Sequence, residues 1–185
     1  MALWKRAVNY FMRNLSFLIS IILLGVLSRL LPHPANFTPI GAIALFSGFY
    51  FKNKNYALLP LITMALSDLL ISGYYGIVMF YVYGSFLLTF LLGRLFLQSS
   101  SSYNRILISS LSGSLLFFAV TNFAVAFHGT MYTKDLTGLL TSYWAALPFF
   151  RNTLLGDIFY NFTFFSSLKF TTTLLKTQKI PSKGA

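Results

Sequence analysis

Residues 15–34, LSFLISIILLGVLSRLLPHP, decide the class of this fold. The run 15–31 is almost wholly apolar and holds a single cation, Arg29, near its end. A membrane-spanning helix needs roughly 20 mostly apolar residues, because the hydrocarbon core of a bilayer is about 30 Å thick. Pro32 and Pro34 end the run, since proline has no N–H to donate and disfavours helix in the preceding residue. No small-x-small cleavage site follows, so we predict a retained transmembrane helix rather than a secretory signal.

The composition of the chain leads to the same class. Of its 185 residues, 56% are hydrophobic and 9% are charged, whereas a soluble domain carries about 25% charged residues. The formal net charge is +11, but the cations stand in short clusters between apolar runs. This pattern is typical of residues that set membrane topology, and not of a nucleic-acid-binding face. The chain has no cysteine, which excludes disulfides and thiolate metal sites.

The rest of the chain repeats the pattern and predicts one transmembrane domain over 1–185. We expect an all-α, polytopic membrane helix bundle of about six helices. The second apolar run is short for a span and contains prolines and glycines, so we expect it to be tilted, broken or re-entrant, which is tolerated only where protein encloses the backbone. The stretch 128–147 is the longest predicted connection, too polar to span but able to hold a short interfacial helix, and the basic tail 176–185 is expected to be disordered. The predicted spans are 15–31, 37–51, 56–72, 76–97, 106–127 and 148–172.

The cations predict the orientation in a cell (inner) membrane. With the N-terminus inside, the segments on the inner side hold Lys5, Arg6, Arg13, Lys52, Lys54, Arg94, Arg105, Lys169, Lys176, Lys179 and Lys183. The outer segments and outer helix ends hold only Arg29, Lys134 and Arg151. Lys and Arg are enriched in cytoplasmic loops, so we predict that both termini lie in the cytoplasm.

Polar residues gather in the outer half of the predicted bundle. A charge inside a membrane usually faces the bundle interior and finds a partner, and Asp68 and Asp157 could pair with Arg29 and Arg151 in either combination. On the last span, Asp157 lies four residues after Thr153, so the two share a helix face. The candidate substrate-binding residues are Arg29, His33, Asn36, Asp68, Asn122, Tyr143, Trp144, Arg151, Asn152 and Asp157.

Simpler interpretations remain open for these residues. Intramembrane polar side chains often only fasten helices together, and Tyr143 and Trp144 could belong to an interfacial aromatic belt. His33 has no second histidine or acid at metal-ligand spacing, so we expect no metal. The chain has no Walker loop, His-Glu-x-x-His or Gly-x-Ser-x-Gly motif, and we expect neither an enzyme nor a cofactor. An acid–base pair of two outer acids would be possible in principle, but no spacing singles out a reaction.

Four segments carry a resemblance to known proteins: 29–48 (RLLPHPANFTPIGAIALFSG), 66–70 (LSDLL), 120–123 (VTNF) and 147–160 (LPFFRNTLLGDIFY). Together they resemble an uncharacterised bacterial family of transporter-like membrane proteins. That family is similar to the substrate-binding (S) components of energy-coupling-factor (ECF) vitamin transporters. The resemblance covers nearly the whole chain.

The resemblance implies six helices with cytoplasmic termini and a nutrient site near the outer face. It also implies a partner, a membrane coupling subunit driven by two ATPases, which S components contact through an Ala-x-x-x-Ala seam on their first helix. This chain lacks that seam, and its nearest matches are Ser16-x-x-x-Ser20 and Ala44-x-x-x-Gly48. We therefore expect a subunit for uptake of a small organic nutrient such as a vitamin, acting alone or with such a module. The alternative is a membrane scaffold or assembly protein without transport activity.

Overall fold

The computed structural model describes the backbone of residues 2–71 and 76–178, and side chains within 15–71 and 76–173. It is helical throughout these ranges, with no strand, which confirms the all-α prediction. The helices are α1 (Ala2–Leu30), α2 (Ile40–Tyr50), η1 (Lys54–Ala57), α3 (Leu58–Ile71), α4 (Val78–Leu92), η2 (Gly93–Leu97), α5 (Tyr103–His128) and α6 (Leu136–Gln178). The element η1 is a 3₁₀ turn that leads into α3, and η2 is a π-helical turn that continues α4.

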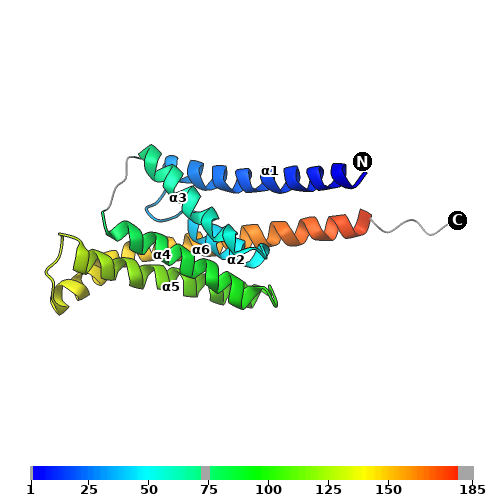
Figure 1. Ribbon diagram of the computed structural model, residues 1–185. Helices are drawn as coiled ribbons and strands as arrows, with labels where there is room; N and C mark the ends of the chain where they lie inside the picture. Colours follow the sequence, from blue (N-terminus) through cyan, green and yellow to red (C-terminus); the bar gives the residue numbers. More distant parts are fainter. Residues whose placement is uncertain (1, 72–75, 179–185) are drawn as a thin grey trace.

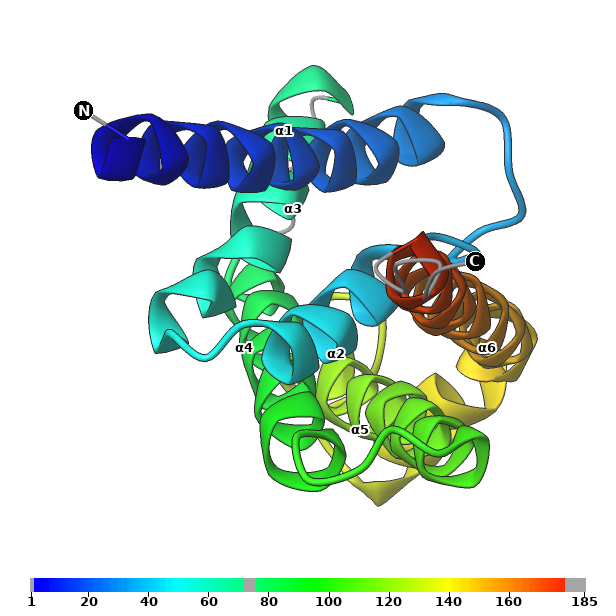
Figure 2. The ribbon, with the colours of Figure 1, turned by 90° about the vertical axis from the view of Figure 1, so that its right-hand side faces the viewer.

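Successive α-helices run in alternating directions between the two ends of the molecule (Figure 1). The start of α1 and the end of α6 therefore lie at the same end of the molecule. Figure 2, seen from that end, shows α2 at the centre with α3, α4, α5 and α6 around it. In the same view α1 lies at the edge, across α3 and strongly inclined to α6. It packs mainly on α3, most closely at Gly25, where an added methyl group would overlap the side chain of Thr63.

Helix α2 is the buried centre of the bundle. Its 11 residues extend for only about 16 Å at 1.5 Å per residue, so it is too short to cross a membrane alone. Residues 42–48 are all buried, as expected for a helix that is apolar on every side. The neighbouring helices thus enclose the backbone of the run that the sequence marked as too short.

Two glycines let α2 and α4 approach until their backbones touch. A methyl group at Gly48 would overlap the Phe90 carbonyl oxygen, and one at Gly93 would overlap the Leu45 carbonyl oxygen. Ala44 and Gly48 are therefore buried inside the bundle, and this small-residue pair cannot serve a partner subunit. The other pair, Ser16 and Ser20, lies on an exposed face of α1.

Helix α6 corrects the predicted connection at 128–147. It begins at Leu136, not near Pro148, and it contains Pro148 within its 43 residues. Asp135 caps its first turn by accepting a hydrogen bond from the Gly138 backbone N–H at 2.7 Å, and this bond lowers the pKa of Asp135. The polar signal in this stretch therefore came from a helix cap. Residues 176–178 of the predicted disordered tail close α6, while 179–185 lie outside the described residues.

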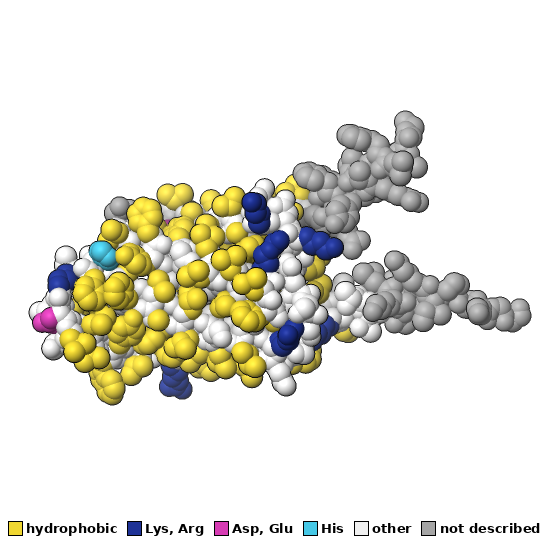
Figure 3. Space-filling view, turned by 60° about the horizontal axis from the view of Figure 1, so that its bottom comes forward, with side chains coloured by type: hydrophobic (Ala, Val, Ile, Leu, Met, Phe, Trp, Pro, Cys, Tyr) yellow, Lys and Arg dark blue, Asp and Glu magenta, His cyan; other side chains and the backbone are white. Residues whose placement is uncertain are grey.

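Three helical segments are long and apolar enough to span a membrane, which suggests a membrane protein: Lys54–Ile71, Val78–Leu97 and Tyr103–His128. Leu15–Leu30 and Ile40–Tyr50 are shorter apolar helices. Figure 3 shows hydrophobic side chains spread over the flank of the molecule, with Lys and Arg gathered toward one end. A water-soluble protein rarely exposes such a large continuous apolar surface.

The contact between α2 and α4 predicts a sharp difference between two glycine variants. Gly48→Ala should lower the free energy of unfolding by about 1–3 kcal/mol, the usual cost of overpacking. Gly84→Ala on α4 is the matched control, because nothing lies within 4 Å of an added methyl group there. The melting temperatures of both purified variants in detergent provide the measurement. Equal melting temperatures would contradict the close approach of these helices.

Candidate functional site

The largest described cavity lies where all six α-helices converge. It has a volume of about 280 Å³, at the lower end of the range of about 300–1,000 Å³ for small-molecule pockets. Each α-helix contributes at least one residue to its lining, and the loop between α1 and α2 contributes three. The cavity is lined by Arg29, His33, Asn36, Thr38, Ile40, Gly41, Met64, Ile71, Phe86, Thr89, Gly113, Phe117, Thr153 and Asp157.

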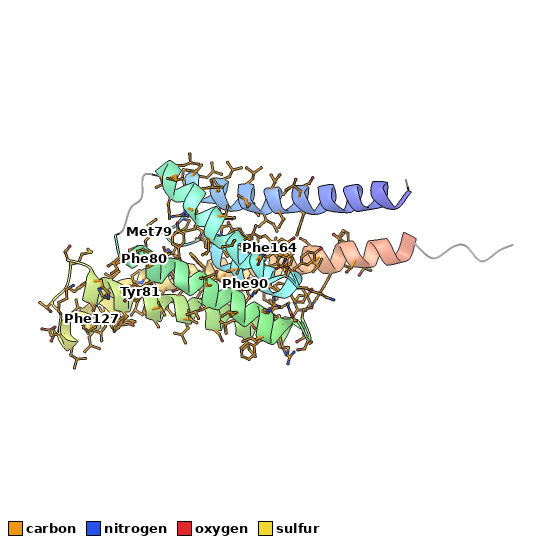
Figure 4. All side chains as sticks on the ribbon, viewed as in Figure 1. Met79, Phe80, Tyr81, Phe90, Phe127 and Phe164 are labelled. Atoms are coloured by element: carbon orange, nitrogen blue, oxygen red, sulfur yellow. The ribbon has the colours of Figure 1, made fainter. Side chains whose placement is uncertain are left out.

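Aromatic side chains pack around the end of α2 in the opposite half of the bundle. Phe46 on α2 packs edge-on against Phe165 on α6, with ring centroids 5.2 Å apart. Phe49 lies 4.9 Å from the same Phe165 ring. Figure 4 shows Phe90 and Phe164 between the helices in this part of the molecule, and Phe90 is almost completely buried. The cavity is therefore confined to the half of the bundle that contains the start of α2.

The loop 31–39 forms one wall of the cavity and is fastened to α6. The Asn152 side chain donates a hydrogen bond to the Ala35 carbonyl at 3.0 Å. A methyl group at Gly156 would lie 3.2 Å from the Cα of Phe37, so the loop backbone rests directly on α6. Asn36 has a φ of 65°, a left-handed conformation that asparagine tolerates better than most residues. These contacts hold His33, Asn36 and Thr38 of this loop against the cavity.

Arg29 and Asp68 form an ion pair that joins α1 to α3. Arg29 Nη1 lies 2.7 Å from Asp68 Oδ1, and both side chains are largely buried. The same Nη1 also donates to the Ser67 hydroxyl, and the Tyr83 hydroxyl donates to Asp68 Oδ2 at 3.0 Å. Of the two pairings that the sequence left open, the structure therefore selects Arg29 with Asp68. Asp68 itself does not line the cavity.

Asp157 reaches the cavity from the middle of α6. Its Oδ2 accepts a hydrogen bond from the Ser114 hydroxyl at 2.6 Å, and its Oδ1 lies against Gly41, where an added methyl group would overlap it. Gly41 is in the first turn of α2, so the carboxyl group faces a helix N-terminus, where the macrodipole favours negative charge. Among the described side chains no cation pairs with Asp157.

The helix face predicted from the spacing on α6 is confirmed as buried. Thr153 is 9% exposed, Asp157 7% and Asn161 1%. The Asn161 amide donates to the Ser110 hydroxyl at 3.1 Å, while its Oδ1 is buried without a hydrogen-bond partner. Thr153 and Asp157 face the cavity, and Asn161 continues the polar face toward the aromatic half.

A smaller cavity of about 110 Å³ adjoins the first and shares Asn36, Phe117 and Thr153 with it. Asn122 lines this second space, although its amide donates to the Phe118 carbonyl at 2.7 Å. The Phe118 ring stacks on Phe150 at 4.4 Å, and both rings line the same space. The two cavities together form an elongated hollow toward the end of the bundle that holds the loop 31–39.

Five predicted site residues line neither of these two cavities: Asp68, Tyr143, Trp144, Arg151 and Asn152. Arg151 is exposed on α6, since it stands six residues before Asp157 and so faces another side of the helix. Trp144 is 76% exposed, as expected for the membrane-belt alternative. Tyr143 donates from its hydroxyl to the Ala119 carbonyl at 2.5 Å, which fastens α6 to α5.

Sequence reasoning missed the small and aromatic part of the cavity wall. Gly113 and Ser114 were not marked by the pattern of spans, and Gly41 was marked only as one of the glycines that interrupt the second apolar run. The only signal was the clustering of serine and glycine over 109–114, which places several small residues on one face of α5. Phe86 and Phe117 were not singled out, because phenylalanines are frequent throughout the apolar runs. Within the described residues, no three His, Asp or Glu side chains come together as metal ligands.

The ion pair between α1 and α3 can be tested by removing one charge. Asp68→Asn leaves Arg29 largely buried without its counter-charge, which should cost about 3–5 kcal/mol of stability. The double variant Arg29→Gln with Asp68→Asn should lose less than the sum of the two single variants, because the two side chains interact directly. Thermal or denaturant unfolding of the four proteins gives the coupling free energy. Additive losses would contradict a direct ion pair.

No curated protein and no solved structure matches this chain. One protein family does match, over residues 9–181, which is most of the chain. It is described as a family of unknown function. The chain therefore belongs to the family of unknown function DUF6580.

Proposed function

We propose that this protein is a multi-pass component of the cell (inner) membrane that binds a small organic nutrient, such as a vitamin, for uptake. In this proposed role it would resemble the S components of ECF transporters. In the proposed orientation, both ends of the chain are cytoplasmic and the loop 31–39 faces outward. The cavity would then receive its substrate from the outside.

The observation that carries this proposal is the convergence of all six α-helices on one cavity. Residues from six separate helices and from the loop 31–39 line it. Concave sites with apolar walls and a few polar groups are the usual form of small-molecule sites. Among the described residues no cation pairs with the Asp157 carboxyl group, and an intramembrane acid without a counter-charge supports a functional role rather than a structural one.

The distribution of cations supports the orientation. Lys52, Lys54, Arg94 and Arg105 lie in or beside the connections after α2 and α4, the helices that run toward the end where α1 begins (Figure 1). Cytoplasmic loops carry the excess of Lys and Arg in membrane proteins. The aromatic half of the bundle is therefore the cytoplasmic half in this proposal, and the cavity beside Asp157 lies in the outer half.

The scaffold alternative has specific support at some positions. Asp68, Tyr143 and Asn152 use their polar groups to join segments of this chain, as a scaffold reading expects. A scaffold role does not explain the cavity beside Asp157. A buried polar side chain with a purely structural role is most stable when protein groups occupy the space around it and satisfy its hydrogen bonds. We therefore favour substrate binding.

A coupling subunit remains a proposed partner. Helix α1 packs mainly on α3, and Ser16, Ser20, Leu23 and Leu27 form an exposed stripe along its other side. Small residues on such a stripe allow another membrane helix to approach closely. This surface is available to a membrane partner, whereas the pair Ala44 and Gly48 is not.

The proposal is tested by filling the cavity with a single methyl group. Gly41→Ala should displace the Asp157 carboxyl group and lower the affinity for the nutrient by at least about tenfold, the effect of losing one hydrogen bond to a charged group. Gly84→Ala is the control, since its methyl group meets no atom within 4 Å. A panel of water-soluble vitamins and nucleobases is screened by thermal shift on the purified protein, and uptake of each compound that binds is then measured in cells.

Two outcomes of this experiment would contradict substrate binding. One is a full panel in which no compound shifts the melting temperature of the wild-type protein. The other is a bound compound whose affinity is the same in the Gly41→Ala and Gly84→Ala variants, because such a compound would bind outside the cavity.

A further inference from the structure

Resting on the proposed function, we infer that the cargo is a small organic cation, whose protonated nitrogen pairs with the Asp157 carboxylate. The charges around the cavity, the direction of its hydrogen bonds and the nature of its walls lead separately to this class of molecule.

The charges leave one carboxylate unbalanced. Arg29 is the only cationic side chain in the lining, and its charge is offset by Asp68 at 2.7 Å. The start of α2 beside Asp157 offers the equivalent of about half a positive charge, which favours the ionised carboxylate without balancing it. A charged group inside a membrane bundle normally finds an opposite charge. Within the described part of the chain Asp157 has none, so a cationic ligand would supply it.

The exposed cations of the outer half are not available to Asp157. Arg151 stands on another face of α6 and is exposed. The Lys134 ammonium donates to the backbone carbonyls of Ala126 and Gly129 at the end of α5. His33 is the remaining basic side chain in the lining. Its Nδ1 lies 2.7 Å from the Leu31 carbonyl and is therefore the nitrogen that carries a proton.

Two of the three threonine hydroxyl groups in the cavity wall, those of Thr89 and Thr153, present acceptors to the hollow. The Thr89 hydroxyl donates to the Ser85 carbonyl at 2.9 Å, and the Thr153 hydroxyl donates to the Phe149 carbonyl at 3.0 Å. A hydroxyl has one hydrogen to donate and two lone pairs, so both groups present lone pairs to a ligand. In the neutral His33 ring, Nε2 does the same, because the proton is on Nδ1. A ligand that brings several N–H donors fits such a wall.

The carboxylate itself has free acceptor capacity. Two carboxylate oxygens together offer about four lone-pair sites, and Ser114 uses one of them at Oδ2. Asp157 lines the cavity while being only 7% exposed. A protonated nitrogen inside the cavity can therefore form a charge-assisted hydrogen bond with it, shielded from water.

The apolar walls favour a flat and compact molecule. The rings of Phe86 and Phe117 lie 5.3 Å apart and nearly parallel, at 28°, and both line the cavity. Aromatic faces attract organic cations as well as flat rings. The volume of about 280 Å³ restricts the ligand to a small molecule. Asn36 and the remaining N–H groups of Arg29 are donors in the lining, and they suit one polar acceptor group elsewhere on the ligand.

Three probes of the same shape separate the charge from the fit. Benzamidine, benzamide and benzoate share one ring and a planar substituent, and at neutral pH they are a cation, a neutral molecule and an anion. Their affinities for the purified full-length protein are measured by calorimetry in detergent at pH 7. We expect the benzamidinium ion to bind at least about tenfold more tightly than benzamide, the ratio for one hydrogen bond to a charged group. We expect benzoate to bind most weakly.

Two neutralising variants assign the preference to one residue. Asp157→Asn should remove the advantage of benzamidinium over benzamide. Asp135→Asn removes an equal charge from an exposed helix cap, where asparagine caps as well as aspartate, and it should leave the advantage unchanged. If Asp157→Asn fails to fold, the ranking of the three probes on the wild-type protein still decides the inference.

The outcomes separate this inference from the proposed function. If benzamide or benzoate binds as tightly as benzamidinium, and Gly41→Ala loses this binding, the inference of a cationic ligand is overturned. The proposed substrate binding in the cavity is then retained. Binding of a nutrient that carries no positive charge in the cavity would likewise overturn the cationic ligand and retain substrate binding. Binding of none of the probes and none of the panel overturns both. An advantage of benzamidinium that survives in Asp157→Asn also overturns the role given to this carboxylate.

Discussion

The short central helix is the constraint from which the rest of the structure follows. With 11 residues, α2 covers roughly half of a hydrocarbon core about 30 Å thick. Five longer helices must pack around a centre that is occupied over only part of its height. Where α2 is present, Phe46 and its aromatic neighbours fill the core. Where α2 has not yet begun, the loop 31–39 and the cavity take its place. The hollow is thus a consequence of helix length.

The same short helix places its N-terminus inside the molecule, with N–H groups that have no partner within the helix. In water such an end is solvated, but here it faces the cavity, and Asp157 lies against it at Gly41. The position of the carboxyl group is therefore tied to the starting point of α2. A longer α2 would fill the cavity and remove the reason for an acid at this depth of α6.

The sequence predicted those features of the fold that depend on composition and on residue spacing along a single helix. It predicted the all-α class, the short enclosed second run and the shared face of Thr153 and Asp157. It was wrong about the start of α6, because Lys134 and Asp135 read as a polar connection while Asp135 in fact caps a helix. It also could not tell how far each helix is rotated about its axis. That rotation exposes Arg151 and brings the uncharged residue Gly41 to the site.

The two buried acids, Asp68 and Asp157, differ in what packs beside them. Asp68 and Asp157 are similarly buried, at 5% and 7% exposure, and both accept a hydrogen bond from a hydroxyl group. Asp68 forms an ion pair with Arg29, and this pair holds α1 against α3. Asp157 has a cavity beside it instead of a cation. Since a buried charge is tolerated when something balances it, the acid with a cation beside it joins two helices, and the acid beside the cavity is the one for which we propose a ligand.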